Sequence, residues 1–252
     1  MYSKFAKLGG LKLVIGTVAL AALAACGGGG GSDDNSTGAG AQVVITGTAA
    51  KGAMLPSASI QLTCANGTNL SATTGADGQY TTAGQIAYPC IGSATQGNLV
   101  YRGILFSGDV ANFTPLTDML VEGVFAASAP GNESLTRAQF IDKLKDATFA
   151  RNLASSADLY RDVVRNQIMR LLALRLQPES LEPIFAPIRQ NFDAIRFRLG
   201  SDLDKLLDNT AQDVQNADGS VKFEVLADVK TEADKLPVPG ASATGATGGS
   251  GS

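Results

Sequence analysis

The sequence of 252 residues contains no histidine, and this absence excludes several kinds of functional site. Ser-His-Asp and Cys-His catalytic groups need histidine as the general base. Zinc sites with histidine ligands, two-histidine iron sites and histidine-ligated haem are excluded for the same reason. The Gly-x-x-x-x-Gly-Lys-Ser/Thr motif of P-loops and the Cys-x-x-Cys motif are also missing. We therefore expect no cofactor, no metal and no catalytic residue, and any enzymatic chemistry would depend on carboxylates.

The chain also lacks an apolar run of the ~20 residues that a transmembrane helix needs. Its apolar stretch at residues 13–25 is shorter, and it follows Lys4, Lys7 and Lys12. A charged start, an apolar middle and small residues at the end are typical of a cleavable secretory signal. We predict a signal peptide at residues 1–25, and a transmembrane anchor is the weaker interpretation.

Residues Leu23, Ala24, Ala25 and Cys26 match the lipobox motif at every position, and in this respect the chain resembles bacterial lipoproteins. The resemblance implies that Cys26 is acylated and anchors the protein to a lipid bilayer, which two or more acyl chains make stable. Gly27 follows where many inner-membrane lipoproteins have Asp, so the resemblance favours the outer membrane of a bacterial cell envelope. The alternative is a secreted protein whose cleavage site happens to precede a cysteine.

Small and polar residues dominate both sides of the central part of the chain. Residues 26–41 include an unbroken glycine run and are predicted to form a flexible tether. Residues 237–252 are predicted to form a disordered tail. Removal of the signal peptide would take three lysines from a chain whose formal net charge is already −3. This acidic balance gives no support for binding nucleic acid.

The composition of the central part changes near residue 112. Residues 42–112 contain short β-branched or alternating runs, separated by turn dipeptides such as Asn66-Gly67 and Asp77-Gly78. This spacing predicts a small β-sandwich. Strands are expected at residues 42–47, 58–64, 80–82, 86–93 and 99–106.

Residues 113–236 have helical periodicity and predict an α-helical domain, so the expected fold class is α+β. Thr114 followed by Pro115 is a favourable helix start, and a capping box begins at Thr136. Residues 217–223 are predicted to form a turn that leads into a short strand. Helices are expected at residues 116–126, 140–144, 158–176, 181–199 and 203–207. Two prolines in 181–199 are expected to confine the regular part of that helix to its later turns.

Three segments within residues 42–112 match parts of a known family's sequence pattern. Residues 44–47 end a strand in glycine, residues 52–60 contain a Gly…Pro…Ala pattern, and residues 74–80 read Thr-x-x-Asp-Gly-x-Tyr. Together they resemble the carboxypeptidase regulatory-like, transthyretin-like β-sandwich. The middle segment departs from the family pattern because Leu55-Pro56 is inverted and Ser57 stands where glycine is usual. The resemblance implies an accessory binding or spacer domain and no catalysis.

Acylation of Cys26 would leave two cysteines, Cys64 and Cys90. Export would place them in an oxidising compartment, so we predict a disulfide between them. A free thiol pair for redox or metal chemistry is the alternative.

Three carboxylates are candidates for glycosidase-like chemistry: Asp109, Asp118 and Glu122. Asp118 and Glu122 lie four residues apart on one predicted helix, where a solvated face is the simpler interpretation. The series Asp202, Asp204 and Asp208 suggests calcium but lacks the glycine and terminal glutamate of an EF-hand. We predict that these three aspartates lie on the outer face of a helix.

Arginine is concentrated between residues 151 and 198, where it outnumbers Asp and Glu. Such a surface could bind anionic lipid, lipopolysaccharide or a partner's carboxylates. Alternatively, the arginines pair with acids nearby on the same helices. The residues concerned are Arg151, Arg161, Arg165, Arg170, Arg175, Arg189, Arg196 and Arg198.

These observations favour a non-catalytic binding or structural module of the cell envelope, anchored through Cys26, with an envelope protein or a glycan as its partner. Two alternatives stay open. One is an envelope hydrolase that acts on glycan or lipid through paired carboxylates. The other is an accessory subunit of an export complex.

Overall fold

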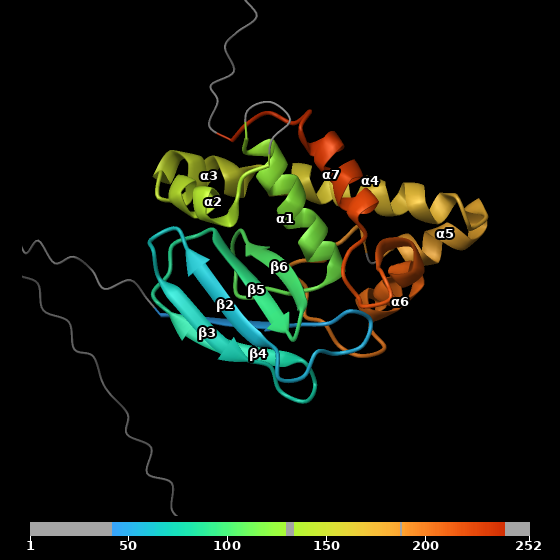
Figure 1. The fold of residues 1–252 in the computed structure, drawn as a ribbon, viewed down its shortest axis with the longest axis horizontal. Helices are drawn as coiled ribbons and strands as arrows, with labels where there is room; N and C mark the ends of the chain where they lie inside the picture. Colours follow the sequence, from blue (N-terminus) through green and yellow to red (C-terminus); the bar gives the residue numbers. More distant parts are fainter. Residues whose placement is uncertain (1–41, 130–133, 187, 240–252) are drawn as a thin grey trace, which may run out of the picture. The chain divides into compact units, whose positions relative to one another are not determined.

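The computed structural model describes residues 42–129, 134–186 and 188–239. Cys26, the predicted signal peptide and the predicted tether lie outside the described residues, as does the predicted tail from residue 240 onward. Six strands come first within the described chain and seven helices follow, so the predicted α+β class is confirmed (Figure 1). Below, residues 42–112 are called the β region and residues 113–239 the helical region.

The β region forms two antiparallel sheets, one with strand order β1-β4 and one with order β3-β2-β5-β6. Its strands are β1 (Val43–Thr48), β2 (Ser59–Cys64), β3 (Asn69–Thr73), β4 (Gln79–Gly84), β5 (Cys90–Gln96) and β6 (Leu99–Leu105). The sequence did not predict β3, and β5 begins at Cys90 rather than at residue 86. Alternating burial along β2, where Ile60 and Leu62 point inward, accounts for the strands that were predicted.

The outer edges of β1 and β6 are covered by chain that follows the strands. The N–H of Thr46 donates to the carbonyl of Asp109, and the N–H of Ala111 donates to the carbonyl of Thr46. At β6, the N–H of Arg102 donates to the carboxylate of Asp118 at 3.0 Å. Unpaired strand edges can promote aggregation, and these contacts bind parts of the β1 and β6 edges to later segments of the chain.

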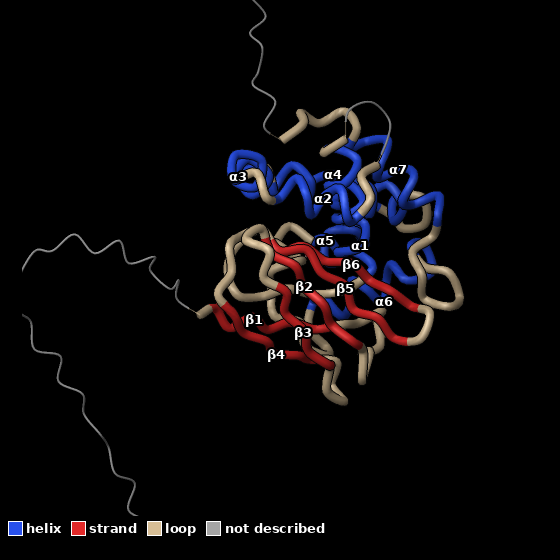
Figure 2. The backbone as a smooth tube through the Cα atoms, turned by 60° about the vertical axis from the view of Figure 1, so that its left-hand side comes forward, coloured by secondary structure: helices blue, strands red, loops and turns tan. Residues whose placement is uncertain are grey.

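The helical region contains α1 (Pro115–Ala127), α2 (Arg137–Leu144), α3 (Ala147–Ser155), α4 (Ala157–Ala173), α5 (Pro178–Phe185), α6 (Asp202–Val214) and α7 (Phe223–Ala233). The predicted caps are confirmed, because Thr114 and Thr136 each accept a backbone hydrogen bond and form a capping box. In Figure 2 the helices of the described residues gather on one side of the strands. None of these helices is long and apolar enough to cross a membrane.

Two predictions about the helical region are wrong. The helix expected at 181–199 is the short α5, which ends at Phe185, and residues 188–199 contain turns. Tertiary bonds hold this segment outside a helix, because the carbonyl of Ile195 accepts from the Asn112 side chain. The strand expected near residue 223 is absent from the described chain. Gln215 and Val221 form a single bridge, and α7 begins directly afterwards.

One hydrophobic core extends through both regions. Helix α1 is buried along almost its whole length and contacts β6, α4 and α7. Phe113, which is fully buried, joins the last segment of the β region to this helix. The two regions therefore stabilise each other through shared apolar burial.

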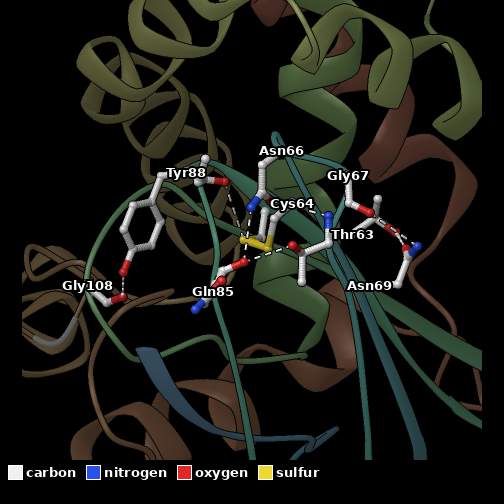
Figure 3. Close-up of a disulfide and its surroundings, with 11 residues drawn as sticks. Thr63, Cys64, Asn66, Gly67, Asn69, Gln85, Tyr88 and Gly108 are labelled. Carbon is white, nitrogen blue, oxygen red and sulfur yellow. Dashed lines mark hydrogen bonds between the residues drawn. A yellow bond between two sulfur atoms is a disulfide. The ribbon is translucent and has the colours of Figure 1, made fainter. Parts of the chain in front are cut away.

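The predicted disulfide between Cys64 and Cys90 is confirmed. The two cysteines lie directly opposite each other on β2 and β5 and are buried. Figure 3 shows the polar contacts around them, including Asn66 Nδ2 donating to the carbonyl of Gln85 at 3.0 Å. The bond fixes the end of the four-stranded sheet.

Candidate ligand-binding pocket

The carboxylates that were considered for catalysis do not face each other across a cleft. Asp118 and Glu122 both bind Arg102, with Nε 2.6 Å from Asp118 Oδ1 and Nη1 3.0 Å from Glu122 Oε2. Burial lowers the pKa of the Arg102 guanidinium, but the two carboxylates raise it to above its ordinary value. Asp109 lies elsewhere, where its Oδ2 atom is 3.4 Å from Arg196 Nη2. Through Arg102, Asp118 and Glu122 fix the edge strand β6 to α1.

The three aspartates of α6 do not converge on a cation. Asp202 pairs with Lys205, and Asp208 is exposed. Asp204 is buried and its Oδ2 accepts from the N–H of Gly200 at 2.8 Å, so the prediction of an outer face is wrong for this residue. Within the described chain, no group of three or more His, Cys, Asp or Glu side chains is arranged to hold a metal ion.

Most arginines between residues 151 and 198 pair with acids, and all but one of these acids lie in the helical region. Ion pairs join Arg161 to Asp158 and Asp193, Arg165 to Asp162, Arg170 to Glu232, Arg175 to Asp213, Arg189 to Glu182 and Arg196 to Asp109. Arg151 and Arg198 differ, because their guanidinium groups make no hydrogen bond or ion pair with any described residue. Both side chains are exposed.

Arg198 lines a cavity of about 400 Å³ between the β1-β4 pair and the segment 196–198. The strand register places Thr46 opposite Thr81 and Thr48 opposite Gln79. Paired residues of neighbouring strands share one face of a sheet, so these side chains form a polar floor, in which Thr48 is buried and Thr46, Gln79 and Thr81 are accessible. The other lining residues are Gly47, Thr73, Tyr80, Val110, Arg196 and Phe197. Among the described residues, no Asp or Glu side chain lines this pocket.

The floor of the pocket depends on a close approach between β1 and the segment after β6. The Tyr80 hydroxyl donates to the carbonyl of Ala111 at 2.7 Å. A Cβ atom at Gly47 would lie 1.8 Å from that carbonyl oxygen and 2.7 Å from the Tyr80 ring. Only glycine fits here. Burial raises the pKa of the Tyr80 phenol, which keeps the group protonated as a donor.

Residues 196–198 form the opposite wall of the pocket. The Asn112 side chain and the Arg161–Asp193 ion pair hold this segment in place. Asn112 Nδ2 donates to the carbonyl of Ile195 at 2.7 Å, while Asn112 Oδ1 accepts from the N–H of Thr48 at 3.2 Å. Arg161 binds Asp193 through two parallel hydrogen bonds of 2.8 Å. Together they fix the segment that carries Arg196 and Arg198 to β1 and to α4.

Sequence reasoning missed this pocket. The alternation of threonines along β1 was a visible sign of a polar sheet face. The segment that covers the face lies more than a hundred residues later, within the stretch that the sequence assigned to a helix. Comparisons of the chain with protein-family models, with curated proteins and with solved structures found no match.

Proposed function

We propose that this protein is a lipid-anchored module of the bacterial cell envelope that binds a carbohydrate without acting on it chemically. The observation that carries the proposal is the polar floor of the pocket, where threonine hydroxyls and the Gln79 amide lie together. Hydroxyl and amide groups both donate and accept hydrogen bonds, as sugar hydroxyls require. This chemistry agrees with the glycan partner expected from the sequence.

The size of the pocket supports the same class of ligand. A volume of about 400 Å³ lies in the lower part of the range for small-molecule sites, which is roughly 300–1,000 Å³. Tyr80, Val110 and Phe197 also line the pocket but are only 4%, 7% and 2% exposed, so a ligand would meet mainly polar groups. With no carboxylate among its described lining residues and no histidine in the chain, the pocket offers no ordinary general acid or base.

Anchoring through Cys26 and the outer-membrane location rest on the lipobox and belong to this proposal. The β region would then serve as a transthyretin-like spacer and as the floor of the binding site. The alternative of an envelope hydrolase gains no support from Asp118 and Glu122, because one arginine binds both. No described feature favours the export-complex alternative.

The pocket is tested by ligand-observed NMR on the full processed protein in detergent. The probes are the methyl glycosides of glucose and galactose, together with the corresponding uronic acids. We expect saturation transfer to at least one probe, and its loss in Thr81→Val, which removes a lining hydroxyl but keeps the side-chain shape. Thr95→Val changes a threonine of β5 outside the pocket and should bind as the wild type does. No transfer to any probe, or equal loss in both variants, would reject the pocket as a carbohydrate site.

The anchor is tested separately by membrane fractionation. Cys26→Ser should release the protein from membranes or leave the precursor unprocessed. Unchanged processing and unchanged membrane partition would reject the lipobox assignment, whatever the result for the pocket.

A further inference from the structure

Arg198 stands out among the arginines of the helical region because it has no acidic partner among the described residues and because it lines the pocket. We infer that the pocket selects anionic sugars over neutral ones, and that Arg198 binds their carboxylate or phosphate group. This inference rests on the proposed carbohydrate function and names the ligand class within it.

Arg196, the second arginine that lines the pocket, forms only a long and exposed ion pair. Arg196 Nη2 lies 3.4 Å from Asp109 Oδ2, and the two side chains are 61% and 59% exposed. Ion pairs of this kind contribute only ~0–1 kcal/mol, so an anionic ligand can compete for the guanidinium. Phe197, between the two arginines, is buried and anchors the segment. The two cations therefore sit on a fixed backbone while their charged ends stay accessible.

No acid among the described residues near the pocket pairs with Arg198. Within the β region the charged residues are Lys51, Asp77, Arg102 and Asp109. Arg102 is neutralised by α1, and Asp109 balances Arg196 in part. Asp77 lies in the turn before β4, where its carboxylate accepts from the N–H of Gln79 at 3.1 Å. Nothing in the described chain pairs with Arg198, so its charge remains for a ligand.

The threonine floor and Arg198 would bind different parts of an anionic sugar. A guanidinium presents a planar fork of N–H donors that matches a carboxylate or phosphate with two parallel hydrogen bonds. The threonine floor matches ring hydroxyls. A neutral sugar would use the floor alone, whereas an anionic sugar would use the floor and the arginine.

The test compares pairs of sugars that differ only in the group at C6, which is anionic in one member and neutral in the other, using the full processed protein in detergent at low salt. The pairs are methyl glucuronide with methyl glucoside, methyl galacturonide with methyl galactoside, and glucose 6-phosphate with glucose. In at least one pair we expect the anionic probe to bind about tenfold more tightly, the effect of one hydrogen bond to a charged group. The first two pairs report a preference for carboxylate and the third a preference for phosphate. The preference should shrink as salt screens the charges.

Two substitutions assign the preference to a residue. Arg198→Gln should abolish the preference for the anionic probe while binding of the neutral probe persists. Arg151→Gln is the matched control, because Arg151 is also exposed and unpaired within the described chain but lines a different groove. Equal affinity for both members of every pair, or a preference that survives Arg198→Gln, would overturn the inference and leave carbohydrate binding intact. No binding of any probe would overturn both.

Discussion

The β region and the helical region of this chain are stabilised by different kinds of polar and covalent interaction. The β region has only four charged residues, and its order comes from strand ladders, side-chain bonds to backbone and the Cys64–Cys90 disulfide. The helical region is rich in Arg, Asp and Glu and joins its helices through ion pairs, such as Arg170 with Glu232 between α4 and α7. Ion pairs and disulfides respond to different solvent conditions, so the polar interactions of each region can be perturbed separately, while the shared core couples the two regions.

The proposed binding pocket lies where these two kinds of surface meet. The β region supplies uncharged hydroxyl and amide groups from β1 and β4, and the helical region supplies Arg196 and Arg198. Neither region alone presents both. The pocket combines a neutral floor with a cationic wall because each region supplies one of them. Damage to either region should therefore affect the site.

The largest effect should come from breaking the buried ion pair that holds the cationic wall. Arg161 and Asp193 are 7% and 3% exposed, and the Arg161 carbon Cζ also lies 5.3 Å from the centre of the Phe106 ring. Asp193→Ala leaves the guanidinium buried with only the exposed Asp158 as a partner. We expect the free energy of unfolding, measured by urea denaturation, to fall by about 3–5 kcal/mol.

The matched control is the exposed pair between Arg189 and Glu182, whose side chains are 64% and 65% exposed. Glu182→Ala should cost less than about 1 kcal/mol because solvent screens the pair. Similar losses in Asp193→Ala and Glu182→Ala would contradict the role given to the buried pair. Asp193→Ala should also weaken ligand binding, since Asp193 positions the segment that carries Arg198.

The next largest effect concerns the β region. Replacing Cys64 and Cys90 together by alanine opens a loop with a sequence separation of 26 residues. The chain-entropy model gives a loss of roughly 3–4 kcal/mol for a loop of this length. We expect this loss in urea denaturation under oxidising conditions. A reductant should destabilise the wild type and leave the double variant unchanged. A wild type that is equally stable with and without reductant would contradict the prediction.

How far the sequence predicts this fold depends on whether an element is specified locally. Thr114 and Thr136 mark helix starts correctly because capping involves residues within one turn. Segment 188–199 was assigned wrongly because its conformation is decided by distant partners. Asn112 and Arg161 bind it from other elements, and no local pattern records those contacts.

The same distinction applies to the candidate site. The disulfide could be predicted because only two cysteines remained for pairing once Cys26 was assigned to the anchor. The arginine cluster was also visible, but the sequence could not separate the paired arginines from Arg198. That separation needs the position of each acid in space, since partners such as Arg161 and Asp193 come from distant parts of the chain.

The smallest expected effect is a change in how the stability of the helical region depends on pH. Lys235 Nζ lies 2.9 Å from Glu232 Oε2, and Arg170 Nη1 lies 3.4 Å from Oε1. The hydrogen bond from Lys235 is the main reason that the pKa of Glu232 lies below its ordinary value, and Arg170 adds to the shift. A carboxyl whose pKa is lower in the folded state stabilises the protein above its unfolded pKa, and this contribution is lost as the pH falls through the folded value.

Lys235→Gln should therefore raise the pKa of Glu232 in an NMR titration and make the helical region slightly less sensitive to acid. The change in stability should be small because the pair is exposed. Lys205→Gln removes another exposed pair, that with Asp202, and should leave the titration of Glu232 unchanged. If the pKa of Glu232 stays the same in Lys235→Gln, the contact with Lys235 does not persist in solution. The ion pairs at the surface of α7 would then contribute less to the helical region than the buried pair between Arg161 and Asp193.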